Sequence, residues 1–185
     1  PWIPTDLKID FINALSQCGL QHIETTSFVS PRWVPQMKDH THVMNSITKE
    51  YDVTYSALIP NSHGLREALT TPIDQINVFT TASQTFSEKN THCTIEESIN
   101  RIQAIINEAT QYSLPIRAYL SCITHCPYEG PIQPNTVINC IERLLELGVN
   151  EVSLGETLGK ATSKEIHKLL QALPTSLPLS QLAFH

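Results

Sequence analysis

The sequence has no apolar run approaching the ~20 residues that a membrane-spanning helix needs. Basic residues are also scarce, since 12 Lys and Arg stand against 18 Asp and Glu, which gives a net charge of −6 with His counted as neutral. An acidic protein is repelled by nucleic-acid phosphates and by anionic lipid, so we expect neither nucleic acid nor membrane as a partner. The absence of Gly-x-Gly-x-x-Gly and of a Gly-Lys-Ser/Thr loop weakens a nucleotide-binding interpretation.

Cysteine is sparse and scattered, and the count is odd: Cys18, Cys93, Cys122, Cys126 and Cys140. A disulfide framework usually shows an even and denser set. We therefore predict mostly buried thiols in a reducing compartment, the cytoplasm or, in a eukaryote, the mitochondrial matrix. The Cys122-x-x-x-Cys126 spacing fits neither a redox pair nor a zinc site, and we interpret it as structural.

What the sequence does contain is a regular alternation of short β-rich runs with helical periods. At 185 residues and 41% hydrophobic content, the chain has the length and composition of one globular domain. The predicted strands are 22–28, 53–59, 75–81, 116–121, 151–154 and 181–185. The predicted helices are 5–18, 35–48, 64–70, 94–109, 134–147 and 162–173. Such alternation predicts parallel strands joined by crossover helices, an α/β fold.

Local signals support several helix ends. Thr5 is the predicted N-cap of the first helix and Gly19 its left-handed stop. Two capping boxes are expected, Thr94 with Glu97 and Thr162 with Glu165. In the first helix, helical spacing is shown by the apolar residues Leu7, Phe11, Leu15 and Cys18.

Polar residues gather where the predicted strands end, as in 24–27, 60–61, 80–83, 119–121, 153–157 and at His185. A (β/α)₈ TIM barrel collects such ends on one face, so the barrel is favoured over an open sheet. A barrel usually needs ~250 residues. We therefore expect a single barrel domain over 1–185 that is incomplete at both ends, lacking its first strand and its last part.

His185 is the main candidate metal ligand, because a histidine at a strand end can point a ring nitrogen into the barrel mouth. The competing interpretation is a hydrogen-bonded structural histidine. His40 and His42 lie two residues apart in a predicted helix, where side chains diverge. We interpret that pair as a solvated face and not as a metal pair.

Carboxylates and hydroxyls near strand ends form the second group of candidates. Glu24 and Glu156 are suited to acid–base or orienting roles, although an ion pair with a basic residue on a neighbouring strand is the better interpretation from the sequence. Ser27, Tyr119, Ser153 and Thr157 could donate to substrate oxygens or cap the strand-to-helix turns.

Four segments resemble 3-hydroxy-3-methylglutaryl-CoA lyases: 23–37, 121–130, 151–159 and 182–185. The resemblance extends over essentially the whole chain and implies a (β/α)₈ barrel with Mg²⁺ or Mn²⁺ at its C-terminal face. The implied reaction cleaves 3-hydroxy-3-methylglutaryl-CoA to acetyl-CoA and acetoacetate by a retro-Claisen route. The family members are typically dimers or larger, so a homodimer or larger assembly and an acyl-CoA partner are expected.

The same resemblance implies roles for individual residues. His185 matches a metal ligand, the first of a His-x-His strand, while Asn90 lies where the CoA portion approaches. The residues matched to the acyl portion or its cavity are Glu24, Ser27, Tyr119, Ser153 and Thr157. Glu156 stands where the family pattern has Asp, which argues against a shared role. No residue of this sequence is assigned as catalytic, because the matching segments would lie beyond it, and we expect the 185-residue piece alone to bind metal poorly and to be inactive.

Two other functions remain open from the sequence. One is a related Claisen-type synthase that joins acetyl-CoA to a 2-oxo acid, and a product assay separates it from the lyase. The other is a non-catalytic truncated barrel that acts as an interaction scaffold through unpaired strand edges.

Overall fold

The structure is a computed structural model that describes residues 2–185. The chain forms two compact units, one reaching Asn77 and including Asn107–Pro115, the other made of Val78–Ile106 and Ile116–His185. Strand β3 (Gln75–Thr81) begins in the first unit and ends in the second. The expectation of a single domain over 1–185 stays a prediction.

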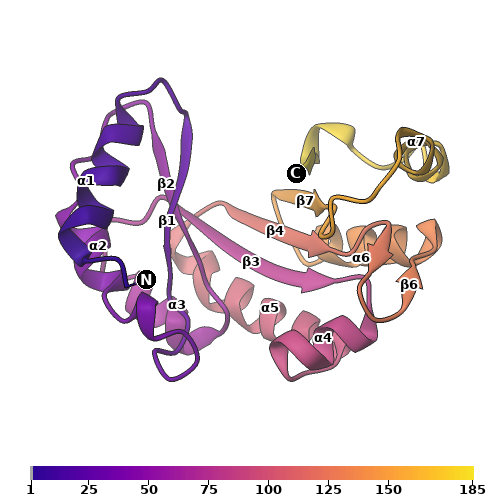
Figure 1. Cartoon of the computed structure of the whole chain (residues 1–185), viewed down its shortest axis with the longest axis horizontal. Coiled ribbons are helices and arrows are strands. Elements are labelled where there is room, and N and C mark those ends of the chain that lie inside the picture. Colours follow the sequence, from indigo (N-terminus) through magenta and orange to yellow (C-terminus); the bar gives the residue numbers. More distant parts are fainter. Residues whose placement is uncertain (1) are drawn as a thin grey trace. The chain divides into compact units, whose positions relative to one another are not determined.

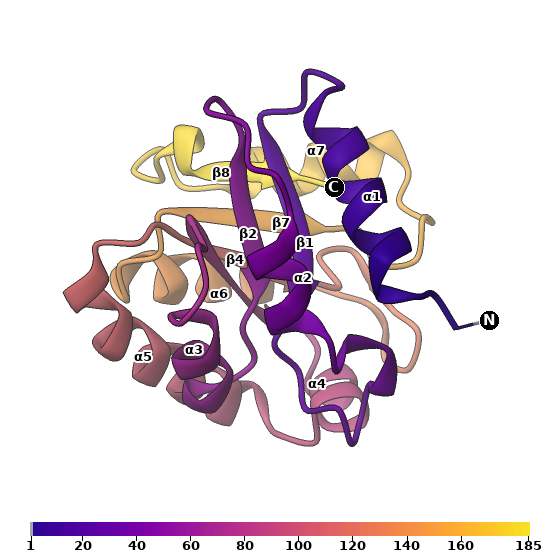
Figure 2. The ribbon, with the colours of Figure 1, turned by 90° about the vertical axis from the view of Figure 1, so that its left-hand side faces the viewer.

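The first unit is a parallel sheet with helices beside it. Its elements are α1 (Thr5–Ser16), β1 (His22–Ser27), a 3₁₀ turn (Pro35–Met37), α2 (His40–Ser46), β2 (Thr54–Leu58), α3 (Ser62–Ala68) and a second 3₁₀ turn (Thr110–Tyr112). The strand order is β1-β2-β3, and both pairs are parallel. Figure 2 shows β1 and β2 side by side, and both α1 and α2 contact β1.

Helix α1 differs from its prediction at both ends. Pro4 occupies the N-cap position, and Thr5 lies inside the helix. The Thr5 hydroxyl is used in a tertiary contact instead, donating to Asp39 at 2.7 Å. Of the apolar residues that recur at helical spacing, Leu7 and Phe11 are 57% and 63% exposed and Cys18 is exposed as well, whereas the buried residues of the helix are Ile12 and Ser16. Gly19 has the predicted left-handed conformation, with φ +77°, although the helix ends earlier, at Ser16.

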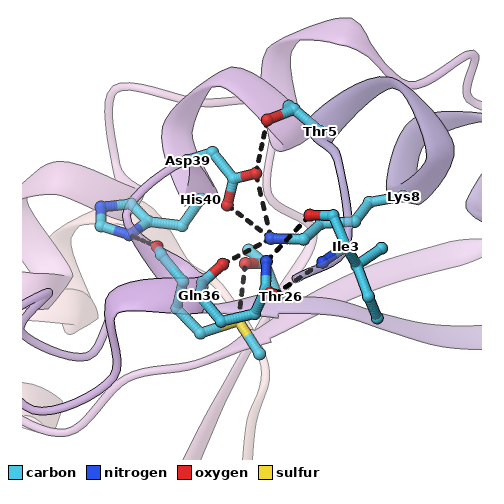
Figure 3. A network of polar contacts seen from close by, with 8 residues as sticks. Ile3, Thr5, Lys8, Thr26, Gln36, Asp39 and His40 are labelled. Atoms are coloured by element: carbon cyan, nitrogen blue, oxygen red, sulfur yellow. Dashed lines mark hydrogen bonds and ion pairs between the residues drawn. The ribbon is translucent and has the colours of Figure 1, made fainter. Parts of the chain in front are cut away.

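The predicted helix 35–48 is broken in two, with the 3₁₀ turn at Pro35–Met37 separate from α2. The break follows from tertiary contacts that fix the intervening residues. Lys8 of α1 donates to the Gln36 carbonyl and to the Asp39 carboxylate, as Figure 3 shows. Helix propensity at these positions is therefore overridden by a largely buried polar network.

The second unit continues the alternation. Its elements are α4 (Gln84–Thr91), α5 (Ile95–Ala109, whose last residues belong to the first unit), β4 (Ile116–Ser121), β5 (His125–Cys126), β6 (Gly130–Pro131), α6 (Pro134–Glu146), β7 (Glu151–Gly155), α7 (Ser163–Ala172), a 3₁₀ turn (Leu179–Gln181) and β8 (Leu182–Phe184). The strand order is β3-β4-β7-β8, with β7 parallel to β4 and β8. Figure 1 labels most of these elements along the chain. Helix α4 and the short antiparallel β5–β6 hairpin were not predicted.

The predicted capping boxes are both present. In α7 the Thr162 side chain accepts from the Glu165 backbone N–H, while the Glu165 carboxylate accepts from Thr162. Thr94 and Glu97 make the same reciprocal bonds ahead of α5. These bonds satisfy N–H groups that a helix start leaves without partners, which is why the motif locates the start so well.

Along strand β4, buried apolar side chains alternate with half-buried polar ones, so the two faces of the sheet differ. Ala118 and Leu120 are fully buried, and α6 contacts both β4 and β7. Arg117, Tyr119 and Ser121 alternate with them and are only half-buried. The parallel α/β architecture is therefore confirmed, with polar side chains on the face away from the buried apolar one. No helix within residues 2–185 is long and apolar enough to cross a bilayer.

Candidate functional site

A cluster of polar and aromatic side chains forms in the second unit around Ser153 and His185. Ser153 is buried on β7, and its Oγ lies 3.1 Å from His185 Nδ1. Tyr119 is opposite Ser153 in the β4–β7 register, and its ring meets the His185 ring edge-on at a centroid distance of 5.6 Å. Three residues predicted from the sequence are therefore brought together, from β4, from β7 and from the position directly after β8.

Arg117 is a member of this cluster that was not predicted from the sequence. Its Nη2 donates to Ser153 Oγ at 3.3 Å, and its Nε lies 2.9 Å from a Glu151 carboxylate oxygen. Its guanidinium carbon lies 5.6 Å from the centroid of the Tyr119 ring. The signal that could have found it is its position two residues before Tyr119, on the same face of a strand.

The backbone places His185 against β7. His185 N–H donates to the Leu154 carbonyl, and the His185 carbonyl accepts from Glu156 N–H. A Cβ at Gly155 would lie 3.1 Å from the His185 ring, tighter than an ordinary contact. The absence of a side chain at Gly155 therefore allows the imidazole to lie over the strand end.

Thr157 and Glu156 hold the loop that follows β7 through hydrogen bonds. Thr157 Oγ1 accepts from the Cys122 N–H at 2.8 Å, and Cys122 has a left-handed φ of +61°. Glu156 accepts from Thr124 Oγ1 and from Lys160 N–H, both at 2.8 Å. Burial raises the pKa of Glu156, but these hydrogen bonds outweigh it and the pKa lies below its usual value. An ionised Glu156 thus ties the loop to the segment after β4.

The predicted residues of the first unit lie on β1. The Glu24 carboxylate accepts from Asn77 Nδ2, which also donates to Ser56 Oγ at 2.9 Å. Asn77 and Ser56 are buried, and neither was predicted as a site residue. Ser27 Oγ is buried and has no hydrogen-bond partner within residues 2–185. A buried hydroxyl of this kind is available to a ligand.

Asn90 is exposed on helix α4. Its Nδ2 donates to the Phe86 carbonyl one turn earlier, at 3.0 Å. Neighbouring Lys89 places its ammonium 4.2 Å from the centroid of the Tyr128 ring. This surface therefore combines a cation, an amide and exposed aromatic area.

Among residues 2–185, no three His, Cys, Asp or Glu side chains are grouped as a ready metal site. His185 nevertheless has the chemistry of one ligand. A ligating histidine usually gives its second ring nitrogen to a polar partner, which fixes the tautomer. Ser153 is such a partner for Nδ1, so Nε2 is the nitrogen left to bind a metal.

The sequence matches the HMGL-like family model over residues 3–185. The chain belongs to the HMGL-like family. This confirms the resemblance inferred from the four segments. Among curated relatives, the cytoplasmic 3-hydroxy-3-methylglutaryl-CoA lyase of Rattus norvegicus is 46% identical over 183 residues. That alignment covers 99% of this chain and 53% of the relative. The mitochondrial hydroxymethylglutaryl-CoA lyase of Gallus gallus is 42% identical, with coverage of 99% and 61%.

Solved structures agree with this HMGL-like assignment. The HMG-CoA lyase from Brucella melitensis aligns with a TM-score of 0.96 and 45% identity, covering 100% of this chain and 65% of that one. An HMG-CoA lyase from Acinetobacter baumannii in complex with coenzyme A and 3-methylmalate aligns with a TM-score of 0.93 and 32% identity, covering 100% and 60%. The chain thus spans between half and two thirds of these relatives and corresponds to part of their (β/α)₈ barrel, as expected.

Proposed function

We propose that the whole protein cleaves 3-hydroxy-3-methylglutaryl-CoA to acetyl-CoA and acetoacetate. The observation that carries the proposal is the joining of Ser153, Tyr119 and His185 at neighbouring strand ends in a member of this family. The reaction is a retro-Claisen cleavage. A base takes the proton of the tertiary hydroxyl, the carbon–carbon bond breaks toward the thioester, and the acetyl-CoA enolate is then protonated.

A divalent cation, Mg²⁺ or Mn²⁺, belongs to this proposal, with His185 Nε2 as one ligand and further ligands from outside the present sequence. When bound, such an ion supplies Lewis-acid stabilisation of an oxygen anion and orients the substrate. Ser153 prepares His185 for this role by holding Nδ1. Tyr119 limits rotation of the imidazole from its edge.

The number of hydrogen bonds that a hydroxyl can make assigns Ser153 a second role. A serine hydroxyl accepts two hydrogen bonds and donates one. Arg117 donates to Ser153, and His185 Nδ1–H is the second donor when Nε2 binds metal. The Ser153 proton is then left for a substrate oxygen. Arg117 is a positioning residue in this scheme, because it acts through Ser153.

On β1, Ser27 and Glu24 are proposed to meet the acyl portion. Ser27 contributes a buried hydroxyl that no residue within 2–185 uses. Glu24 contributes a carboxylate whose orientation is fixed by Asn77. We propose that Thr157 binds substrate as well, because it lies two residues after the end of β7, the strand that carries Ser153.

Asn90 is proposed to contact the CoA portion. CoA carries an amide-rich pantetheine arm, phosphates and a planar base, and the α4 surface offers an amide, the Lys89 cation and the Tyr128 ring to such a ligand. The related lyase from Acinetobacter baumannii, solved in complex with coenzyme A, supports a CoA-bearing ligand.

Assembly, location and metabolic role are further parts of the proposal. We propose a homodimer or larger assembly, in the cytoplasm or the mitochondrial matrix, that acts in leucine degradation and ketone-body formation. The names of the relatives include both cytoplasmic and mitochondrial forms.

The deciding experiment is a product assay on the whole protein with Mg²⁺ and 3-hydroxy-3-methylglutaryl-CoA. Equal amounts of acetoacetate and acetyl-CoA are expected. Consumption of acetyl-CoA with a 2-oxo acid, without cleavage of the hydroxymethylglutaryl thioester, would identify a synthase instead. Absence of both reactions would support the scaffold alternative.

A further inference from the structure

Helix α4, which carries Lys89 and Asn90, is held in place by little apolar burial. It has eight residues, and Ser87 is the one residue among Gln84–Thr91 that is buried. Isolated helices shorter than about 12–15 residues are marginal in water, and helices in proteins owe most of their stability to packing of an apolar face. Contacts at the start and on the surface of α4 must therefore keep it ordered.

A carboxylate from outside the helix caps its first turn. Glu129 Oε1 accepts from Thr85 N–H at 2.6 Å, and Thr85 is the second residue of α4. Hydrogen bonds from the side chain and the backbone of Thr85 hold the pKa of Glu129 below its usual value, so the carboxyl group is ionised at neutral pH. A negative charge at this end of a helix also interacts favourably with the helix dipole.

The residue before Glu129 packs on the same helix. The centroid of the Tyr128 ring lies 6.3 Å from that of the half-buried Phe86 ring, and the Lys89 ammonium lies 4.2 Å from the Tyr128 centroid. Phe86 and Lys89 are three residues apart, so they share one face of α4. One tyrosine ring thus contacts two successive turns of the helix and orients the cation next to Asn90.

The hairpin turn that carries both residues has supports of its own. Cys126 pairs with Gly130 across the β5–β6 hairpin, and His125 Nε2 lies 3.3 Å from a carboxylate oxygen of Glu165 on α7. The buried Ser83 hydroxyl donates to Cys126 Sγ at 2.9 Å. The same hydroxyl accepts from the backbone of α4 as its N-cap. The hairpin is therefore a fixed support on which α4 rests.

We propose that Tyr128 and Glu129 are positioning residues for CoA binding, which hold α4 so that Lys89 and Asn90 meet the ligand. This inference rests on the function proposed above, in which Asn90 contacts the CoA portion. Neither positioning residue has to touch CoA, because Glu129 acts through the first turn of α4 and Tyr128 through Phe86 and Lys89. A ligand that needs an ordered helix binds more weakly in proportion to the fraction of molecules in which that helix is disordered.

The first measurement is hydrogen exchange of the whole protein without ligand, followed by mass spectrometry over Gln84–Thr91. Loss of a cap shifts a helix equilibrium by about fivefold, so Glu129→Ala should speed exchange in α4 by roughly that factor. Tyr128→Ala should speed it by about two- to fivefold. Exchange in β4 and β7 should stay as in the parent. Glu129→Gln keeps an oxygen in place and Tyr128→Phe keeps the ring, so both should retain most of the protection of α4.

The second measurement is the affinity for CoA itself, by calorimetry on the whole protein. The double variant Tyr128→Ala/Glu129→Ala should bind CoA roughly threefold more weakly or worse, because an unsupported helix of this length is mostly disordered. Asn90→Ala should weaken CoA binding by about two- to tenfold without faster exchange in α4, since it removes a contact and not a support. Glu146→Ala, at an exposed position of α6, is the matched control and should change neither quantity.

Tyr128 and Glu129 are exposed, so the variants should fold, and circular dichroism verifies this. Four results would overturn the proposal: no CoA binding by the parent, unchanged α4 exchange in the double variant, unchanged CoA affinity in the double variant, or equal effects in Glu146→Ala. Neither measurement depends on turnover. A parent that responds as expected but does not cleave 3-hydroxy-3-methylglutaryl-CoA would contradict the lyase reaction and leave the positioning role in place.

Discussion

Ser153 Oγ of β7 and His185 Nδ1, directly after the adjacent strand β8, lie 3.1 Å apart. The contact fixes the one histidine that the sequence assigns to a metal. It also links that histidine to Arg117, which donates to the same oxygen. The orientation of His185 is therefore set by a residue 32 positions away in sequence.

The first prediction concerns Ser153→Ala. Removing the oxygen frees His185 Nδ1, and loss of such an outer-shell partner costs roughly 10–100-fold in metal affinity. Mn²⁺ binding to the whole protein, followed by electron paramagnetic resonance, measures this. Ser163→Ala, on an exposed position of α7, is the matched control. Equal affinity in both variants would contradict the role given to Ser153.

The second prediction concerns Asn77→Ala. Asn77 is 1% exposed, and it donates to both Glu24 and Ser56. Its loss leaves buried polar groups with fewer partners, so the free energy of unfolding should fall by about 1–3 kcal/mol. Urea unfolding measures the change. Asn90→Ala removes an exposed side chain, and its free energy of unfolding should stay within about 0.5 kcal/mol of the parent value. A similar loss of stability in both variants would contradict the stabilising role given to the Asn77 hydrogen bonds.

The third prediction is a pH dependence carried by Asp39. Partial burial raises the pKa of Asp39, but hydrogen bonds from Lys8 and Thr5 outweigh it and hold the pKa below its usual value. A carboxyl whose folded pKa is depressed stabilises the fold above its unfolded pKa of about 3.9. That contribution is lost as the pH falls through the lower folded value.

Asp39→Asn should therefore lower stability at pH 7 by about 1–2 kcal/mol, and by progressively less as the pH falls below about 3.9, because the parent then loses the same contribution. Urea unfolding between pH 2 and 7 compares the two proteins. Asp6→Asn changes an exposed residue of α1, and its stability should depend on pH as that of the parent does over the whole range. An Asp39→Asn curve that stays parallel down to low pH would contradict the assignment.

The fourth prediction concerns thiol reactivity. Cys18 is exposed, and the other four cysteines are buried. Burial raises the pKa of Cys126, yet hydrogen bonds from Ser83 and from the Tyr128 and Glu129 N–H groups bring it below its usual value. Its sulfur should still react slowly, because burial blocks access.

A disulfide-exchange reagent should therefore modify Cys18 quickly in the native protein and all five of these thiols in denaturant, with peptide mass spectrometry locating the label. Cys18→Ser should abolish the fast labelling, whereas Cys140→Ser should leave it unchanged. Fast labelling of any of the other four in Cys18→Ser would show that a buried thiol is reachable.

Local patterns along the chain were enough to establish the parallel α/β class and most element positions. Strands β3 and β4 coincide with their predicted ranges, and the capping boxes at Thr94 and Thr162 lie where expected. Period and capping depend on residues within one turn or one strand, so a linear sequence contains that information. The family resemblance was likewise readable from contiguous segments.

Which side chains meet, in contrast, depends on tertiary packing. Thr5 is not an N-cap and its hydroxyl binds Asp39, while His40 is buried because Phe28 packs on it. Arg117 and Asn77 were not predicted, since each acts on a residue more than 30 positions away. Such contacts depend on strand register and helix approach, which a local pattern does not encode.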